Sequence, residues 1–390
     1  MKIAYLGIID ITKEAAESRH VFEVCENWQR LGHEVSLFVP EVPGRPSQSL
    51  STRVVKVKTF GLKPSFALTM VYNFSAVFYV FKHVVSNGID MVYSRHSMLE
   101  FIPVLCLKLF SARYATEING LDSEQKRLYG LAKWKIQVSE YCDGLCYRLA
   151  DAIVTVTDEI RGFVLSTYNL KANRVHVVSN GANVKTSRPI PKELACMKLG
   201  IDQSYTYLVF VGSLKQWHGV ENAIVALKCL TGKYPTLKLL VVGDGNELEN
   251  LKSLVKKEAL ESQVIFTGKV RYDQVPNYIN AATLCLAPFD TQRNDLTGLS
   301  PLKIFEYMAC GKPIVTTMVG GLERIINEHQ CGCAVEPGNL KALVEGIDGL
   351  LGNPALCEKL GRNGRRAAEQ FYAWPKISER ILNVISSRRY

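Results

Sequence analysis

The sequence has few of the features that mark a metalloprotein, a redox protein or a secreted protein. Its eleven cysteines are scattered, and the two close pairs, Cys142/Cys146 and Cys331/Cys333, do not have the two-residue spacing of a zinc or redox motif. The seven histidines form no cluster with carboxylates at metal-ligand spacing. The first residues, MKIAYLGIID, show no basic region followed by an apolar stretch and a cleavage site. We therefore expect a reduced, cytoplasmic protein without a metal site.

One stretch lacks charge altogether. Residues 64–81 carry no charged side chain, and this length reaches the lower limit for a membrane-spanning helix. Ser65, Thr69, Asn73 and Ala76 recur at intervals of three and four, which gives a helix with a small and polar stripe. Three interpretations stay open: a helix packed on the N-terminal sheet, which we favour, a helix on a membrane surface, and a true span.

Composition indicates a globular chain with two domains. The 390 residues exceed what one hydrophobic core usually serves, and 47% are apolar while 22% are charged. The net charge of +10 favours an anionic partner. Charge alone cannot decide whether that partner is a sugar nucleotide, an anionic membrane or a nucleic acid. No motif with interleaved basic and aromatic residues stands out, so nucleic acid is not expected.

Strand-like and helical segments alternate in both halves of the chain. KIAYLGI, a helix over about 15–31, HEVSLFVP, DMVYSR and DAIVTVT predict a parallel sheet in the first half. YLVFVGSL, LKLLVVGDG, VIFTGKV, TLCLAPF and PIVTT, separated by helical stretches, predict a second one. We interpret 180–203 as the connection and assign residues 1–188 and 189–373 to two domains, with the helix at about 374–390 completing the first. The predicted fold is α/β: two Rossmann-like, doubly wound domains facing a central cleft.

The strongest motif is GLSPLKIFEYMACGKPIVTT, residues 298–317. A small-residue and proline turn, a short helix with a glutamate, and a strand follow one another in it. This order resembles the donor site of retaining GT-B glycosyltransferases of family four, also called group 1, in a subgroup with Ser-Pro-Leu-Lys-x-Phe-Glu. The resemblance implies that the helix start, Ser300, Pro301, Leu302 and Lys303, binds the donor diphosphate through its N–H groups and dipole. It also implies that Glu306 accepts the ribose hydroxyls.

A second segment, FVGSLKQWHGVENAI at 210–224, has a glycine-rich turn between a strand and a helix. Members of the family carry an arginine just after the strand glycine, Gly212 here, and a lysine before the second glycine. This sequence has Ser213 and His218 at those positions. We expect Lys215 and His218 to supply the missing positive charge.

Two further segments are expected at the donor. Gly243 and Gly245 in VVGDG end a strand where a larger side chain would obstruct a ligand. VIFTGKV, ending at Val270, resembles the family segment whose backbone reads the nucleotide base. The donor, a UDP-sugar or a GDP-sugar for example, stays unassigned.

The sequence departs from the family pattern at two places. The first glutamate of the family's Glu-x7-Glu pair is replaced by Gly298, and Asp295 is a nearby substitute. The N-terminal histidine of many relatives is missing, and Glu117 and Asn119 stand in its region, a Glu-x-Asn-Gly pattern. We name Arg95, His96, Glu117 and Asn119 as candidates on the acceptor side, with structural roles as the alternative, and expect Asn180-Gly181 to be structural.

The resemblance implies a hexosyltransferase that moves a sugar from a nucleoside diphosphate to an acceptor hydroxyl with retention, without metal or cofactor. Glycans, lipid-linked saccharides and polysaccharides are the acceptors or products that it allows. The positive charge and residues 64–81 favour a peripheral position at the cytoplasmic membrane face. Two rival functions stay open: a sugar phosphorylase or epimerase, and a catalytically degenerate subunit that binds a partner glycosyltransferase.

Overall fold

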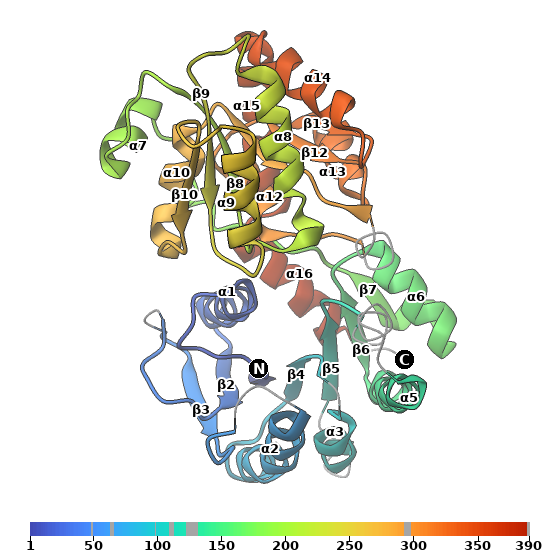
Figure 1. Cartoon of the computed structure of the whole chain (residues 1–390). Coiled ribbons are helices and arrows are strands. Elements are labelled where there is room, and N and C mark those ends of the chain that lie inside the picture. Colours follow the sequence, from blue (N-terminus) through green and yellow to red (C-terminus); the bar gives the residue numbers. More distant parts are fainter. Residues whose placement is uncertain are drawn as a thin grey trace. The chain divides into compact units, whose positions relative to one another are not determined.

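A computed structural model describes residues 1–47, 50–62, 66–97, 99–108, 113–121, 132–291 and 298–387. The chain forms two compact units, Met1–Ser179 with Trp374–Tyr390, and Asn180–Ala373 (Figure 1). Each unit is a parallel sheet with helices on both faces. The predicted fold class of two doubly wound α/β domains is confirmed.

The sheet of the first unit has seven strands in the order β3-β2-β1-β4-β5-β6-β7. Every neighbouring pair is parallel. The strands are β1 (Lys2–Leu6), β2 (Glu34–Pro40), β3 (Arg53–Val57), β4 (Met91–Arg95), β5 (Arg113–Ile118), β6 (Ala152–Thr155) and β7 (Val175–Val177). Because parallel strands need crossovers, each consecutive pair is joined through a helix or a long loop.

Alternate residues of β1 pack on opposite helix layers. Tyr5 lies against Trp28 of α1 (Ala16–Arg30), and the indole N–H of Trp28 donates to the Ser378 carbonyl of α16 (Trp374–Ser386) at 2.9 Å. Ala4 and Leu6 face the other layer. That layer contains α2 (Phe66–Asn87), α3 (Phe101–Lys108), α5 (Lys133–Leu149) and α6 (Asp158–Tyr168), and a short 3-10 turn, η1 (Ala172–Arg174), precedes β7. The C-terminal helix α16 thus belongs to the first unit.

The uncharged stretch 64–81 falls within α2, apart from residues 64 and 65, which lie outside the described residues. Tyr72, Ala76 and Val80 are buried in the core of the first unit, and the Tyr72 hydroxyl donates to the Phe38 carbonyl at 2.8 Å. The favoured interpretation, a helix packed on the sheet, is therefore correct. None of the helices in the described part of the chain is long and apolar enough to cross a membrane.

The sheet of the second unit has six parallel strands in the order β10-β9-β8-β11-β12-β13. They are β8 (Thr206–Val211), β9 (Leu237–Val242), β10 (Val264–Gly268), β11 (Leu284–Ala287), β12 (Ile314–Thr317) and β13 (Gly332–Val335). The helices are α7 (Lys192–Leu199), α8 (Val220–Leu230), α9 (Leu248–Lys257), α10 (Val275–Ala281), α12 (Leu302–Ala309), α13 (Leu322–His329), α14 (Leu340–Leu351) and α15 (Pro354–Phe371), with 3-10 turns η2 (Gln216–His218) and η3 (Tyr272–Gln274). In β8, Tyr207 and Val209 face the layer of α10, α12 and α15, while Leu208 and Phe210 face that of α8, α9 and α14.

The segment 180–203, which we interpreted as a connection, is folded onto the second unit. Ala182 bridges to Ala373, and the Arg365 guanidinium donates to the carbonyls of Val184 and Ser187. Residues 192–199 form α7, which packs on α10. Residues 180–188, assigned from sequence to the first domain, therefore lie in the second unit.

Candidate functional site

Gly212 ends β8 with a backbone that favours glycine. Its φ is +142°, and a Cβ at this position would lie 2.8 Å from the Lys303 ammonium nitrogen. The Gly212 N–H donates to the Val242 carbonyl at 2.9 Å, so the strand end is fixed to β9. This packing places the Lys303 ammonium directly at the carboxyl end of the central strand, where open α/β sheets bind ligands.

Lys303 is a buried cation at the start of α12. Its side chain lies over the Phe210 ring, with Nζ 3.9 Å from the centroid, and Nζ is 5.0 Å from the Phe289 centroid. Nζ has no hydrogen-bond partner among the described residues. Burial lowers the pKa of Lys303 to about 7, against the opposing effect of the Glu306 charge. A buried ammonium without a partner is costly, and this cost is the reason that burial lowers the pKa of Lys303.

The beginning of α12 adds polar groups beside Lys303. Pro301 is the N-cap and provides no side-chain cap to the first-turn N–H groups, among them those of Leu302 and Lys303. Ser300 is held by Asn180, whose N–H donates to Ser300 Oγ at 2.8 Å and whose amide nitrogen donates to the Ser300 carbonyl at 2.7 Å. Asn180 thus positions the turn before α12, in line with the structural role expected for Asn180-Gly181.

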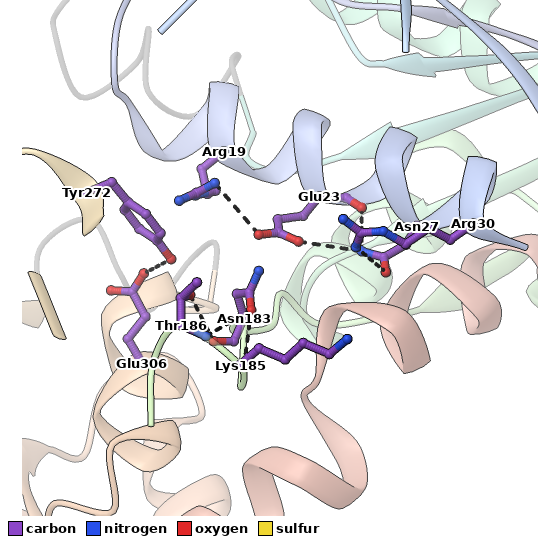
Figure 2. Close-up of polar contacts among 9 residues, drawn as sticks. All are labelled: Arg19, Glu23, Asn27, Arg30, Asn183, Lys185, Thr186, Tyr272 and Glu306. Atoms are coloured by element: carbon purple, nitrogen blue, oxygen red, sulfur yellow. Dashed lines mark hydrogen bonds and ion pairs between the residues drawn. The ribbon is translucent and has the colours of Figure 1, made fainter. Parts of the chain in front are cut away.

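Glu306 lies one turn further along α12 and is buried. The Tyr272 hydroxyl donates to Glu306 Oε1 at 2.6 Å (Figure 2). Tyr272 belongs to η3, directly after β10. Sequence analysis missed Tyr272, because the contact joins residues from two elements that are separate in the chain. Together, Lys303 and Glu306 place a cation and a carboxylate three residues apart on α12.

His218 and Ser213 form the turn after β8. His218 Nδ1 hydrogen-bonds the Ser213 carbonyl, which fixes the proton on Nδ1 and leaves Nε2 as the second nitrogen of the ring. The His218 ring packs edge-on against Phe289, 5.5 Å between centroids, the ring that also neighbours Lys303. Lys215 contributes its carbonyl, which accepts the His218 N–H at 3.0 Å. The structure thus brings Ser213 and His218 to the same strand end as Lys303.

Glycine is required at positions 243 and 245 for a different physical reason from the one expected. A Cβ on Gly243 would lie 1.9 Å from the Gly212 carbonyl oxygen, and one on Gly245 would lie 2.2 Å from that of Leu214. These glycines therefore allow the ends of β8 and β9 to approach each other. A sequence pattern alone cannot distinguish this role from leaving space for a ligand. Val270 is half-buried and packs on the core beside α10.

Gly298 has a φ of +62°, a conformation that glycine adopts easily and a glutamate would adopt only with strain. The backbone conformation at position 298 thus suits the glycine of this sequence better than the glutamate of the family. Asp295, named as its substitute, lies outside the described residues.

Glu117 is the centre of a buried polar cluster in the first unit. His20 Nε2 lies 2.8 Å from Glu117 Oε1, the Tyr93 hydroxyl donates to Oε2 at 2.6 Å, and the Asn119 amide donates to Oε1. Arg95 Nη1 is 4.0 Å from the same carboxylate. Burial raises the pKa of Glu117, but the His20 charge and hydrogen bond, with Arg95, outweigh it and lower that pKa to about 2. Arg95, Glu117 and Asn119 are thus brought together around an ionised carboxylate.

Trp374 packs beside the histidine of this cluster: the His20 ring lies edge-on to Trp374, 5.2 Å between centroids. The preceding residue of α1, Arg19, pairs with Glu23, and its Nη1 lies 3.8 Å from Glu23 Oε1 (Figure 2).

His96 is separate from this cluster. Its Nε2 lies 3.0 Å from Asp143 Oδ1 and its Nδ1 3.3 Å from Glu100 Oε2. Burial lowers the pKa of His96, but the two carboxylates outweigh burial and raise it to about 10. A buried imidazolium held between two carboxylates joins the segment before α3 to α5. This geometry favours the structural alternative for His96.

Comparisons with known proteins agree with this arrangement. Residues 18–186 match the family model "Glycosyltransferase Family 4", and residues 192–367 match "Glycosyl transferases group 1". The chain belongs to the group 1 and family four glycosyltransferases. The curated α-maltose-1-phosphate synthase of Mycobacterium tuberculosis is 24% identical over 261 residues, covering 64% of this chain and 66% of that protein. Matched segments of the first curated relatives span less than two thirds of their length.

Solved structures of GT-B type share the fold over the whole chain. Sucrose-phosphate synthase from Thermosynechococcus elongatus superposes with a TM-score of 0.81 at 18% identity, covering 99% of this chain and 98% of that one. Anabaena HepE, solved in complex with UDP-glucose, gives 0.78 at 16% identity with full coverage of both chains. The GT-B assignment of the fold is thereby confirmed.

Among the residues that the structure describes, no group of three or more His, Cys, Asp and Glu side chains is placed to hold a metal ion. The cysteines with described side chains are all free, and all but Cys229 and Cys333 are buried.

Proposed function

We propose that this glycosyltransferase moves a sugar from a nucleoside diphosphate to an acceptor hydroxyl with retention of the anomeric configuration. The buried, unpartnered Lys303 ammonium at the start of α12 is the observation that carries the proposal. A diphosphate accumulates negative charge as the sugar leaves, and a preorganised cation and helix N-terminus stabilise that charge. The complex of the HepE neighbour with UDP-glucose supports a nucleotide-sugar donor of this kind.

Different residues of the second unit bind different parts of the donor. Lys303 and the N–H groups of Leu302 and Lys303 bind the diphosphate, with Ser300 and Pro301 shaping the turn. His218, fixed through Nδ1, presents Nε2 as a further donor when protonated. Glu306 accepts hydrogen bonds from the ribose hydroxyls, and Tyr272 orients that carboxylate. Gly212, Ser213, Gly243, Gly245, Lys215 and Val270 form the surrounding loops.

A reaction with retention does not require a side chain of the protein to act as general base. In front-side transfer, the departing phosphate oxygen takes the proton of the acceptor hydroxyl, so no side chain has to serve as a general base. The positive charge of Lys303 and His218 neutralises the diphosphate, which makes a metal-independent reaction reasonable. We place Arg95, Glu117 and Asn119 on the acceptor side, where the buried, ionised Glu117 holds the partly exposed Arg95 and Asn119 for a polar acceptor.

The most direct test compares Glu306→Gln with Glu323→Gln, a half-buried carboxylate on α13. Glutamine keeps an oxygen for Tyr272, so the melting temperature should barely change. Loss of charge-assisted bonds to ribose should cost about 1.5 to 3 kcal/mol, at least a tenfold fall in turnover at subsaturating donor. The measurement belongs at about pH 6 or below, because the Glu306 charge raises the pKa of Lys303 and its loss lowers that pKa further. A Glu306→Gln enzyme as active as Glu323→Gln would remove the ribose assignment.

The second candidate is a degenerate subunit that binds a partner glycosyltransferase, and Gly298 in place of the family glutamate motivates it. A screen of sugar nucleotides for slow release of nucleoside diphosphate distinguishes the two. Release from one donor supports the enzyme, and inertness to all donors supports the subunit. The product class, whether glycan, lipid-linked saccharide or polysaccharide, follows from the acceptor found.

A further inference from the structure

Helix α2 is apolar on both of its faces. Tyr72, Ala76 and Val80 point into the core, whereas the opposite face carries large apolar side chains at intervals of four, four and three. The most exposed of them, Phe78, is 76% accessible. A helix that only packs on a sheet has one apolar stripe and a polar outer face, so packing on the sheet does not explain the exposed rings of Phe74 and Phe78.

The same pattern recurs on the neighbouring helices. On α5, Trp134, Val138 and Tyr141 are exposed at intervals of four and three, and Trp134 is 63% accessible. Helix α3 lies between α2 and α5 and exposes Leu105 (Figure 1). The inner sides of all three helices pack on one core, so their outer sides point away from the same face of the sheet. We call the exposed set the aromatic face: Met70, Phe74, Phe78, Phe81, Leu105, Trp134, Val138 and Tyr141.

Among the described residues of α2 and α5, the exposed charged side chains next to these rings are lysines, whereas Glu140, beside Tyr141, is half-buried. Residues 66–87 contain no carboxylate, and exposed Lys82 follows Phe81. Exposed Lys133 and Lys135 flank Trp134, with the Lys135 Nζ 5.6 Å from the Trp134 ring centroid. Large apolar patches on a monomer mark sites of interaction, and aromatic rings bordered by lysines are the composition of a surface that meets anionic lipid.

We propose that the aromatic face docks on an anionic lipid bilayer, with its rings at the boundary between headgroups and acyl chains. Tyrosine and tryptophan are favoured at that boundary because their rings have an apolar body and a polar edge. Lys82, Lys133 and Lys135 then reach the lipid phosphates. A second copy of the chain fits less well, since a two-fold interface through this face would bring the same lysines together.

Docking of this kind does not depend on sugar transfer, and vesicle binding measures it alone. The wild-type protein should sediment with phosphatidylglycerol vesicles at low salt and bind phosphatidylcholine vesicles more weakly. The double substitution Phe74→Gln/Phe78→Gln should lower the partition onto anionic vesicles at least tenfold. Met197→Gln, which removes an exposed side chain of α7 in the second unit, is the matched control and should bind as wild type. Lys133→Gln/Lys135→Gln should reduce binding to anionic vesicles and its salt sensitivity.

A fluorescence measurement on the wild-type protein tests the same proposal without relying on the folding of a variant. Vesicles with brominated acyl chains should quench the fluorescence of Trp134, and Trp134→Phe should lose that quenching while Trp28 and Trp374 stay buried. The proposal is overturned if wild-type protein stays in the supernatant with both vesicles, or if Phe74→Gln/Phe78→Gln binds as wild type. It is also overturned if the protein sediments as a dimer that the double substitution dissociates, since a second copy would then cover the face.

Discussion

If Lys303 binds the donor diphosphate, affinity for the donor must fall as pH rises. Burial lowers the pKa of this lysine to about 7, so the ammonium is the minor form in alkaline solution. A donor that binds only the ammonium form loses affinity in proportion to the fraction of competent protein. The dissociation constant should therefore rise about tenfold for each pH unit above 7, because each unit corresponds to about 1.4 kcal/mol.

The assay is calorimetric titration with an intact sugar nucleotide between about pH 6 and 9. An intact donor is preferable to a free nucleoside diphosphate, because a terminal phosphate itself titrates at about pH 6. Buffers with different enthalpies of ionisation report proton uptake. At about pH 8 the free lysine is mostly neutral and the bound one is charged, so roughly one proton should be taken up per donor. At about pH 6 the uptake should be small.

The variant Lys303→Met separates this role from folding. Methionine replaces a buried cation with an apolar side chain of similar length between Phe210 and Phe289, so stability should be unchanged or higher. Its donor affinity should be weak, and any pH dependence that remains should disappear in Lys303→Met/His218→Gln. His218→Gln is the control for the other titratable group nearby and should keep the slope. Wild-type affinity that is constant from about pH 6 to 9, with no proton uptake, would refute the placement of Lys303 at the diphosphate.

Three further outcomes follow from single contacts. Tyr272→Phe removes the hydrogen bond to Glu306, and we expect the KM for donor to rise about five- to tenfold with kcat nearly constant; a fall in kcat alone would argue against positioning. Gly245→Ala should destabilise the second unit by about 1 to 3 kcal/mol through collision with the adjacent backbone, whereas Gly349→Ala, in open space on α14, should not; thermal melts compare the two. His96→Gln should cost about 3 to 5 kcal/mol, because it leaves two buried carboxylates without their cation. The raised pKa of His96 stabilises the fold fully below its unfolded value near 6.5 and loses this effect as pH approaches about 10, so the difference between wild type and variant should shrink over that window.

The buried strands with an apolar run and the long amphipathic helices could be predicted from the sequence, including four-residue strands such as β6, β11 and β12. The predicted helix over about 15–31 is α1, and the strands KIAYL and LKLLVV are found in register with their neighbours. Helix α7 was missed inside a stretch rich in proline and polar residues. Its signals were present, since Pro191 precedes its first residue and Gly200 closes it in the left-handed conformation. Strands β7 and β13 were missed because they lie at the edges of their sheets with one buried residue each, so neither has the apolar run of a central strand.

The site divides in the same way. A helix start with Ser-Pro-Leu-Lys is visible as a motif, but its relation to Phe210 depends on packing across the sheet. Two partners of Glu117, His20 and Tyr93, lie 97 and 24 residues away in the chain. The order of the parallel strands and the packing of α1 on the sheet bring them together. Sequence separation of this kind carries no local signal.

The difference between Ser213 and the arginine that relatives carry there has a chemical consequence. An arginine keeps its charge at every pH a protein meets, and it can stay in water until a diphosphate arrives. In this protein the Lys303 ammonium lies at the end of β8. It belongs to helix α12 and is buried against Phe210. A buried lysine interacts more strongly with a diphosphate because water does not screen it, but it holds its proton weakly until the diphosphate is bound. If Lys303 binds the diphosphate as we propose, donor binding and protonation form one coupled event, whereas an exposed arginine would keep them separate.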